Sequence, residues 1–267
     1  MKTEDSLLKQ RIFRTFVELS NSKLQSNMLK KFAQSKMSKL IIPQFAKTFQ
    51  INVAEAAKPI GEYKSLHQFF IRSLAAGSRT VEAKEDVIVS PVDGKIATFG
   101  ALNEQSQFMV KGQTYSLTDM LGDKGEAKRY VGGQFIIFYL SPKDYHRIHS
   151  PVAGQIKRQW RLGGRSYPVN EMGLKYGKKP LSHNYRLLTE LEVEEKSLVV
   201  VKVGAMNINS IELTHDHTHL KKGEEIGYFS FGSTVILLFE PNFLTFDSIQ
   251  ENQNIKMGEK IARKSQA

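Results

Sequence analysis

The stretch SPVDGKI at residues 90–96 recurs as SPVAGQI at residues 150–156. In each copy a proline-containing turn leads into a run that starts at a glycine and continues with strand-forming residues. A repeat of this kind indicates two similar β units that pack together. The fold class that we predict is therefore α+β, with N-terminal amphipathic helices followed by a mostly β, sandwich-like domain built from the two units.

Short β-branched and aromatic runs, separated by Gly and Pro, surround the two copies of the repeat. Each run has the length and composition of a strand in a sheet that is at least half buried. The expected strands are 87–89, 95–99, 134–140, 155–162, 197–203, 210–213 and 234–239. The last helix is expected at 66–71, which divides the chain into a helical region, residues 1–80, and a β-rich domain, residues 81–267.

The composition limits the chemistry that is open to the chain. Its 267 residues are 40% hydrophobic, which is enough to bury one substantial core or two smaller ones. The absence of cysteine excludes disulfides, thiolate zinc sites and a cysteine nucleophile. Covalent chemistry would therefore have to come from a hydroxyl, an amine or a carboxylate.

Most of the positive charge lies at the N-terminus. Residues 1–50 hold ten Lys or Arg against three acidic residues, a net charge of +7, and apolar residues recur there at helical spacing from Leu8 to Phe32. Such helices either lie in an anionic membrane interface or pack on the core with a solvated basic face. The segment has no aromatic stacking pattern for nucleic acid, and no apolar run is long enough to span a bilayer. We expect contact with a membrane surface and no nucleic-acid partner.

A carboxylate, two imidazoles and a hydroxyl stand out as candidates for chemistry. Asp93 lies in the first repeat, His146 and His149 precede the second, and Ser233 follows Gly232 at the start of a predicted strand. An imidazole can take the proton of a serine hydroxyl, and a carboxylate can orient the imidazole. The ordinary alternatives are an Asp-Gly turn, a pair of loop histidines and a tight Gly-Ser-Thr turn into a buried strand. Sequence alone does not establish that these groups are close together.

A histidine-rich segment, His215-Asp216-His217-Thr218-His219, suggests a different chemistry. On a strand, alternate imidazoles would share one face, as in a metal-binding pair. This pattern would fit a zinc peptidase of the β-sandwich type, whereas a solvated histidine-rich turn is the simpler interpretation. We expect no metal.

The longest motif resembles the hallmark segment of phosphatidylserine decarboxylases. It runs from GGQF at residues 132–135 through YLSPKDYHRIHSP at residues 139–151. The family's other landmarks lie on both sides of this motif and in the family's order. They are residues 91–94, 111–117, 167–170, 184–186, 203–205 and 231–234, so that the resemblance covers residues 50–240. Two features depart from the pattern: Phe231 replaces a usual leucine, and residues 206–209 replace a glycine-containing stretch.

The resemblance implies a proenzyme that cleaves itself between Gly232 and Ser233. Asp93, His149 and Ser233 match the family's triad, and cleavage would give a β chain of residues 1–232 and an α chain of residues 233–267. Ser233 would become the covalent pyruvoyl cofactor, which forms a Schiff base with the substrate amine and accepts electrons as carbon dioxide leaves. His146 matches the residue expected to act in decarboxylation and reprotonation.

The resemblance also implies the substrate and the location. The reaction would convert phosphatidylserine in an anionic membrane to phosphatidylethanolamine, in phospholipid biosynthesis, on the cytoplasmic face of the cell membrane. Tyr167, Pro168, Val169 and Asn170 match a segment expected to contact the substrate. A homodimer and a monomer both remain open. A catalytically inactive lipid-surface module with the same fold is the remaining alternative, and it would stay one polypeptide.

Overall fold

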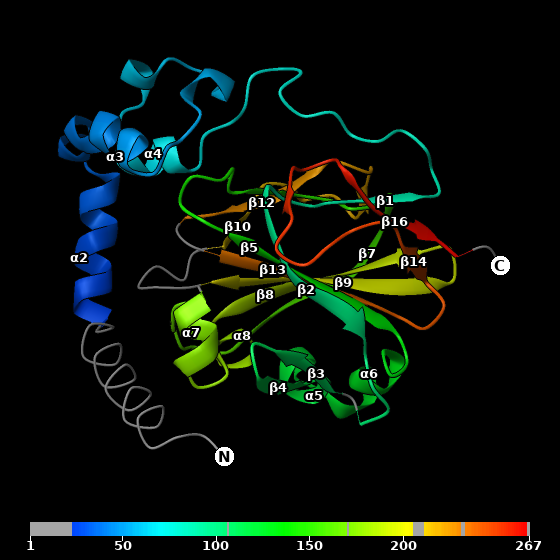
Figure 1. Ribbon diagram of the computed structural model, residues 1–267. Helices are drawn as coiled ribbons and strands as arrows, with labels where there is room; N and C mark the ends of the chain where they lie inside the picture. The colour runs from blue at the N-terminus through cyan, green and yellow to red at the C-terminus, as the bar shows by residue number, and fades with distance from the viewer. Residues whose placement is uncertain (1–22, 106, 170, 205–210, 231–232, 266–267) are drawn as a thin grey trace.

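The computed structural model describes residues 23–105, 107–169, 171–204, 211–230 and 233–265 (Figure 1). Helices form the first part of this region and strands dominate the rest, so the predicted α+β class is confirmed. The N-terminal part contains α2 (Lys23–Gln34), η1 (Lys36–Ile41), α3 (Ile42–Thr48), η2 (Val53–Glu55), η3 (Ile60–Glu62) and α4 (Leu66–Phe70).

The N-terminal helices have a small core of their own. Ile42, Leu66 and Phe69 pack together in it, and Ser38 joins η1 to α4 because its hydroxyl donates to the Ala33 carbonyl and accepts from the Leu66 amide. The helices lie together at one end of the β domain (Figure 1). The same helices carry several exposed apolar side chains: Met28, Leu29, Phe32, Met37, Leu40, Ile41 and Phe49.

The strands form one large sheet and three small ones, and all of their pairings are antiparallel. The eight-stranded sheet has the order β11 (His219–Leu220), β7 (Gly154–Leu162), β8 (Arg186–Val193), β9 (Lys196–Gly204), β13 (Ser233–Phe239), β5 (Gln134–Leu140), β2 (Gly94–Ala101), β15 (Asn254–Ile255). The three-stranded sheets are β1 (Val87–Val89), β16 (Lys260–Lys264), β14 (Leu244–Phe246) and β6 (Arg147–His149), β12 (Glu225–Phe229), β10 (Ile211–Leu213). A hairpin of β3 (Gln107–Val110) and β4 (Gln113–Ser116) completes the set.

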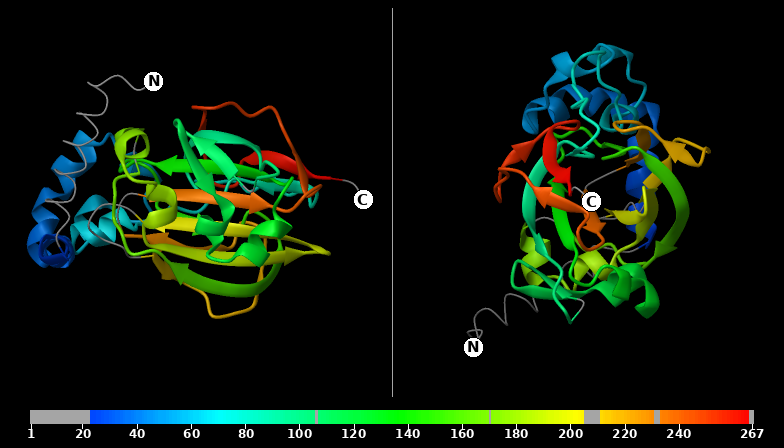
Figure 2. Two further views of the ribbon diagram at one scale, coloured as in Figure 1. Left: turned by 90° about the horizontal axis from the view of Figure 1, so that it is seen from below. Right: turned by 90° about the vertical axis from the view of Figure 1, so that its right-hand side faces the viewer.

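Two units with the same topology build the β domain, as the repeat predicted. The second unit, β6 to β12, is continuous in sequence and is inserted into the first between β5 and β13. The strand orders match element for element: β2 and β7 occupy equivalent places, as do β5 and β8, and the central strands β13 and β9 pair with each other. The curved eight-stranded sheet therefore has a two-fold topology about its centre (Figure 2).

The repeated turns are where the two units meet. The Val89 amide donates to the Pro151 carbonyl (3.0 Å), and the His149 amide donates to the Pro91 carbonyl (2.8 Å). In each turn the serine hydroxyl donates to the carbonyl two residues later, in residues 90–92 and in residues 150–152. Each unit thus supplies a backbone acceptor for the other, which fixes the relative position of the two turns.

Buried apolar side chains cover both faces of the large sheet. One core lies between this sheet and the two three-stranded sheets, and the other lies beneath the β3–β4 hairpin and four short helices. These helices are α5 (Leu117–Leu121), α6 (Lys124–Arg129), α7 (Glu171–Tyr176) and α8 (Pro180–His183). The prediction that 66–71 holds the last helix is therefore wrong. N-caps such as Ser116 and Asp123 start helices too short to show a periodic apolar pattern.

Candidate active site

Strand pairing fixes the position of Ser233. It is the first residue of β13, and its Cα lies opposite Leu140 of β5 on one side and Gly204 of β9 on the other. Gly232 and Phe231 lie outside the described residues. The start of this central strand is therefore held between two neighbouring strands, at the point where the chain returns from the inserted unit.

His149 ends β6 and is 8% exposed. Its Nδ1 atom lies 2.9 Å from the Gly223 carbonyl oxygen, and its Nε2 atom lies 3.1 Å from the Tyr145 hydroxyl. A carbonyl can only accept, so Nδ1 carries the proton and Nε2 accepts from the tyrosine. Burial lowers the pKa of His149, which keeps the ring neutral. The arrangement leaves Nε2 as the basic atom of the ring.

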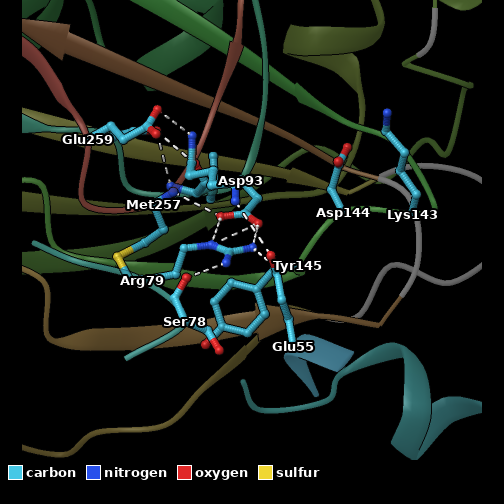
Figure 3. A network of polar contacts seen from close by, with 12 residues as sticks. Glu55, Ser78, Arg79, Asp93, Lys143, Asp144, Tyr145, Met257 and Glu259 are labelled. Carbon is cyan, nitrogen blue, oxygen red and sulfur yellow. Dashed lines mark hydrogen bonds and ion pairs between the residues drawn. The ribbon is translucent and has the colours of Figure 1, made fainter. Parts of the chain in front are cut away.

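Asp93 precedes β2 and is 7% exposed. Its carboxylate accepts hydrogen bonds from the Met257 amide (2.9 Å) and from Nε (2.9 Å) and Nη2 of Arg79. Arg79 also donates to Glu55 (2.8 Å), so that its guanidinium lies between two carboxylates (Figure 3). No hydrogen bond joins Asp93 to His149 in the described part of the chain, although the negative charge of Asp93 acts to raise the pKa of His149.

His146 is completely buried, in the connection between β5 and β6. Its ring stacks on Phe70 of α4 with centroids 4.1 Å apart, and its Nε2 donates to the Ser141 carbonyl (3.0 Å). Burial, together with the nearby positive charge of Arg72, lowers the pKa of His146 to about 3. Ser141 follows Leu140, the residue opposite Ser233, so His146 is fixed beside the start of β13.

A cavity of about 410 Å³ opens beside the carboxylate of Asp93. Its walls come from the N-terminal region, the first β unit and the connection that carries His146. Charged residues dominate these walls: Glu55, Arg72, Arg79, Asp93, Lys143, Asp144, Lys256 and Glu259.

The segment predicted to contact the substrate lies close to the same strand ends. The side chain of Asn184 bonds both the amide and the carbonyl of Tyr167, and it also donates to the Gly204 carbonyl (2.9 Å). Gly204 is the Cα partner of Ser233. Tyr167 and Val169 are buried, and Asn170 lies outside the described residues.

The histidine-rich segment does not form the strand that a metal pair would need. His215 and His217 lie in a loop, and only His219 belongs to a strand, the short β11. His217 instead bonds the Glu224 carboxylate (2.7 Å). The alternative of alternating histidines on one strand face does not hold, because the strand β10 ends at Leu213 and residues 214–218 form a loop.

Four residues with a direct place in this network were not identified from the sequence: Arg72, Arg79, Tyr145 and Gly223. Tyr145 stands inside the YHRIH motif, four residues before His149, and could have been included on that basis. Gly223 acts through its backbone carbonyl, which no side-chain pattern reveals. Arg72 and Arg79 lie in the non-repetitive stretch between α4 and β1, where nothing marks them.

Comparison with known proteins identifies the family of the chain. Residues 66–263 match the family model of phosphatidylserine decarboxylase. A phosphatidylserine decarboxylase proenzyme of Anoxybacillus flavithermus is 52% identical over 94% of this chain and 95% of its own length. Proenzymes of the same name from a Geobacillus species and from Bacillus thuringiensis are 50% and 46% identical, over 94% and 96% of this chain and 97% and 98% of their own lengths. The chain therefore belongs to the phosphatidylserine decarboxylase family.

Proposed function

We propose that this protein decarboxylates phosphatidylserine to phosphatidylethanolamine after cutting its own chain between Gly232 and Ser233. The observation that carries the proposal is the position of Ser233 at the start of a central strand, next to the Ser141–His149 segment. The family's proenzymes supply the precedent for a precursor that must be processed. The product pair would be a β chain of residues 1–232 and an α chain of residues 233–267.

His149 is the proposed base for the cut. Its Nδ1–H is held by the Gly223 carbonyl, so Nε2 is the basic atom. When the Tyr145 hydroxyl turns away, Nε2 can accept the proton that the Ser233 hydroxyl loses as it attacks the Gly232 carbonyl carbon. The Gly232–Ser233 amide bond breaks, its nitrogen takes a proton, and an ester links the two segments. Loss of the α-proton of residue 233 then breaks the ester C–O bond, and the Gly232 carboxylate leaves, which separates the two chains. The backbone carbonyl of Gly223 thus fixes the tautomer of this histidine, a task that a carboxylate performs in other triads.

Asp93 contributes to the proposed triad through its charge and not through a bond to His149. A negative charge near the ring stabilises the imidazolium that forms when Nε2 takes the proton. Arg79 and the Met257 amide fix the carboxylate in place, and Glu55 shares the positive charge of Arg79. Asp93 is therefore a positioning and electrostatic residue in this proposal.

The cofactor implied by the family is a pyruvoyl group formed from Ser233, and once formed it supplies an electron sink for decarboxylation. The surroundings of Ser233 fit such a group. The start of β13 is paired with a strand on each side, and the nearby His146 side chain is fully buried. His146 is held by Phe70 and by the Ser141 carbonyl, and its low pKa keeps it neutral. We assign to it the proton transfer that completes the reaction at the substrate carbon.

Intact mass and a denaturing gel test the proposal directly. The purified protein should separate into two chains, the smaller one carrying the mass of a pyruvoyl terminus, and it should release carbon dioxide from phosphatidylserine vesicles. Ser233→Ala should remain one chain and be inactive. An uncut wild-type chain that still decarboxylates would refute the mechanism, and an uncut, inactive chain that binds lipid would favour the inactive module.

We further propose that the N-terminal helices dock the enzyme on the cytoplasmic face of the membrane. Met37 and Leu40 are 73% and 84% exposed, and the neighbouring Lys36 and Lys39 are exposed as well. Apolar side chains flanked by lysines match an anionic lipid interface. No helix in the described segments is both long and apolar enough to span a bilayer.

Vesicle flotation tests the docking surface. Met37→Glu combined with Leu40→Glu should weaken binding to vesicles containing phosphatidylglycerol by at least about tenfold, because two apolar side chains no longer enter the interface. Met109→Glu is the matched control, since Met109 is 65% exposed on β3 of the β domain. Equal binding by the double variant and the control would remove this role from the helices.

A further inference from the structure

Arg72 is a buried cation whose contacts are incomplete. It follows α4, is only 4% exposed, and donates through Nη2 to the carbonyls of Lys143 (3.1 Å) and Asp144 (3.4 Å). Its Nε and Nη1 atoms are buried, and neither has a hydrogen-bond partner among the described residues. These two nitrogens carry most of the N–H donors of a guanidinium, which stays charged at all ordinary pH values.

No carboxylate contacts Arg72 directly. Within the described ranges it forms no ion pair, although the negative charges of Asp93, Asp144 and Glu55 act on it from a distance. The guanidinium carbon lies 5.4 Å from the ring centroid of Phe69. This isolation contrasts with Arg79, which lies seven residues away and bonds two carboxylates. A buried charge without a counter-ion is costly, so a structure that keeps one has a reason to do so.

Two cavities meet at Arg72. One is the 410 Å³ cavity beside Asp93, and the other is a smaller one of about 190 Å³ that is also lined by Lys58, Tyr63 and Arg147. The smaller volume suits a headgroup fragment better than a whole lipid. Positive side chains outnumber the one carboxylate, Glu62, on its wall. An anion of headgroup size would therefore find space beside Arg72, and a turn of the guanidinium would offer it the two unpaired donors.

Arg72 is also close to the proposed chemistry. Phe70, two residues earlier, stacks on His146, and the Lys143 and Asp144 carbonyls that hold Arg72 belong to the connection carrying His146. The positive charge of Arg72 is one cause of the low pKa of that histidine. An anion bound at Arg72 would accordingly be part of a molecule that also reaches His146.

We propose that Arg72 binds the phosphodiester of the substrate headgroup, by a turn of its guanidinium that brings the buried Nε and Nη1 donors to the cavity wall. This inference rests on the proposed function. The substrate's carboxylate is the less suitable anion, because it loses its charge as carbon dioxide leaves. An ion pair to that carboxylate would stabilise the ground state more than the transition state and would slow the reaction. The phosphodiester keeps its charge throughout, so a contact with it holds the lipid without opposing the chemistry.

Isothermal titration of the uncut Ser233→Ala chain tests this assignment without the cofactor. The probes are glycerophosphoethanolamine, which has a phosphodiester and no carboxylate, and free serine, which has a carboxylate and no phosphate. Adding Arg72→Gln should weaken glycerophosphoethanolamine binding by about 10-fold to 100-fold, as expected for lost charged hydrogen bonds. Arg72→Lys keeps the positive charge but loses the planar, two-pronged guanidinium. Its affinity for glycerophosphoethanolamine should lie between that of the Ser233→Ala chain and that of the Arg72→Gln variant. Arg161→Gln, at an exposed arginine of β7, is the control and should bind normally.

The outcomes separate this proposal from the proposed function. No binding of glycerophosphoethanolamine by the Ser233→Ala chain, or equal binding after Arg72→Gln, would overturn the phosphodiester assignment. A dependence on Arg72 seen only with free serine would assign Arg72 to the carboxylate instead. Thermal unfolding of each variant identifies any that fail to fold, and Arg72→Lys then carries the test. Self-cleavage and carbon dioxide release by the wild type test the proposed function independently of all these results.

Discussion

The two β units share one topology and differ at the residues to which we assign the chemistry. His149 precedes the second Ser-Pro turn, and the equivalent residue before the first turn is Val89. Asp93 follows the first turn, and the equivalent residue after the second is Ala153. Because the turns bond to each other, a histidine from one unit and an aspartate from the other lie at one junction. The junction has two related sides, and the proposed catalytic pair, Asp93 and His149, replaces Ala153 and Val89 on only one of them.

The cavities repeat this asymmetry. The Asp93 cavity is lined by Arg79 and Lys256, whereas a cavity of about 580 Å³ in the equivalent place of the second unit is lined by Ala153 and Lys222. The duplicated backbone thus creates two similar recesses, and single side chains decide which recess has a function. Substitutions that make one unit resemble the other are the most direct way to test this view.

Replacing His149 with its counterpart gives the largest expected effect. His149→Val should slow self-cleavage by about 10²-fold to 10⁴-fold, the usual contribution of a general base. The backbone bond from residue 149 to the Pro91 carbonyl does not involve the side chain and should survive. Cleavage is measured by gel densitometry after purification, with exposed His217→Ala as the control. A His149→Val chain that is cut at the wild-type rate would show that the imidazole is not the base.

Replacing Asp93 with alanine, the residue at the equivalent position 153, should mainly lower the free energy of unfolding. Asp93→Ala leaves Arg79 buried with only Glu55 as an ionic partner and leaves the Met257 amide without its acceptor. Breaking a buried pair in this way costs about 3 kcal/mol in the free energy of unfolding. Urea unfolding in the Ser233→Ala background measures the change without interference from cleavage.

Asp93→Asn separates the charge of this residue from its hydrogen bonds. Asparagine can still accept from the Met257 amide, so more of the stability should return than in Asp93→Ala. A loss below about 1 kcal/mol for Asp93→Ala would mean that the Arg79 pair does not stabilise the fold.

The sequence predicted several long apolar strands but missed others, such as β8 and β12, and it predicted the contacts between side chains poorly. The reasons are physical. Runs such as 134–140 match β5 residue for residue because a buried strand needs continuous apolar side chains. The repeat at residues 90–96 and 150–156 predicted the two units because each copy needs the same turn. A second repeat, KMGE at residues 256–259 and KKGE at residues 221–224, was not recognised in the sequence. In the structure the glycine of each copy has a positive φ, as expected for two equivalent turns.

The partners of Asp93 and His149 could not be read from the sequence. A triad pattern names three side chains only. In the structure, His149 donates a hydrogen bond to the backbone carbonyl of Gly223, and the Asp93 carboxylate accepts from two nitrogens of Arg79. Backbone groups leave no trace in residue identity. The pairing of Arg79 with Asp93 depends on the path of an irregular segment, which has no periodicity to follow.

The pH dependence of stability is expected to be a smaller effect than the loss of Asp93. The pKa of His146 is lowered to about 3, so the folded chain binds fewer protons than the unfolded chain below the ordinary value of about 6.5. Stability is complete above that value and is lost as the pH falls. Between pH 6.5 and pH 5 this histidine should remove about 2 kcal/mol, at about 1.4 kcal/mol per pH unit. Urea unfolding of Ser233→Ala at pH 7 and pH 5 measures the loss.

His146→Gln in the same background identifies the source of that loss. Glutamine does not titrate, so the drop between pH 7 and pH 5 should shrink by about 2 kcal/mol. His149, whose pKa burial also lowers, would still contribute a loss in the same direction. An unchanged drop would show that His146 is not held neutral by the fold.

The smallest expected effect on stability comes from a substitution in the second unit, where a residue is replaced by its counterpart in the first unit. Lys222 occupies the place of Met257, and its ammonium donates to the backbone carbonyls of Lys84 (2.5 Å) and Val87 (3.3 Å). Lys222→Met should change the free energy of unfolding by less than about 1 kcal/mol, since these bonds are partly exposed and an apolar side chain fits the equivalent position in the other unit. Self-cleavage and decarboxylation should stay within twofold of the wild type. A larger loss of activity would mean that the second recess takes part in the reaction and that the two units are less different than their side chains indicate.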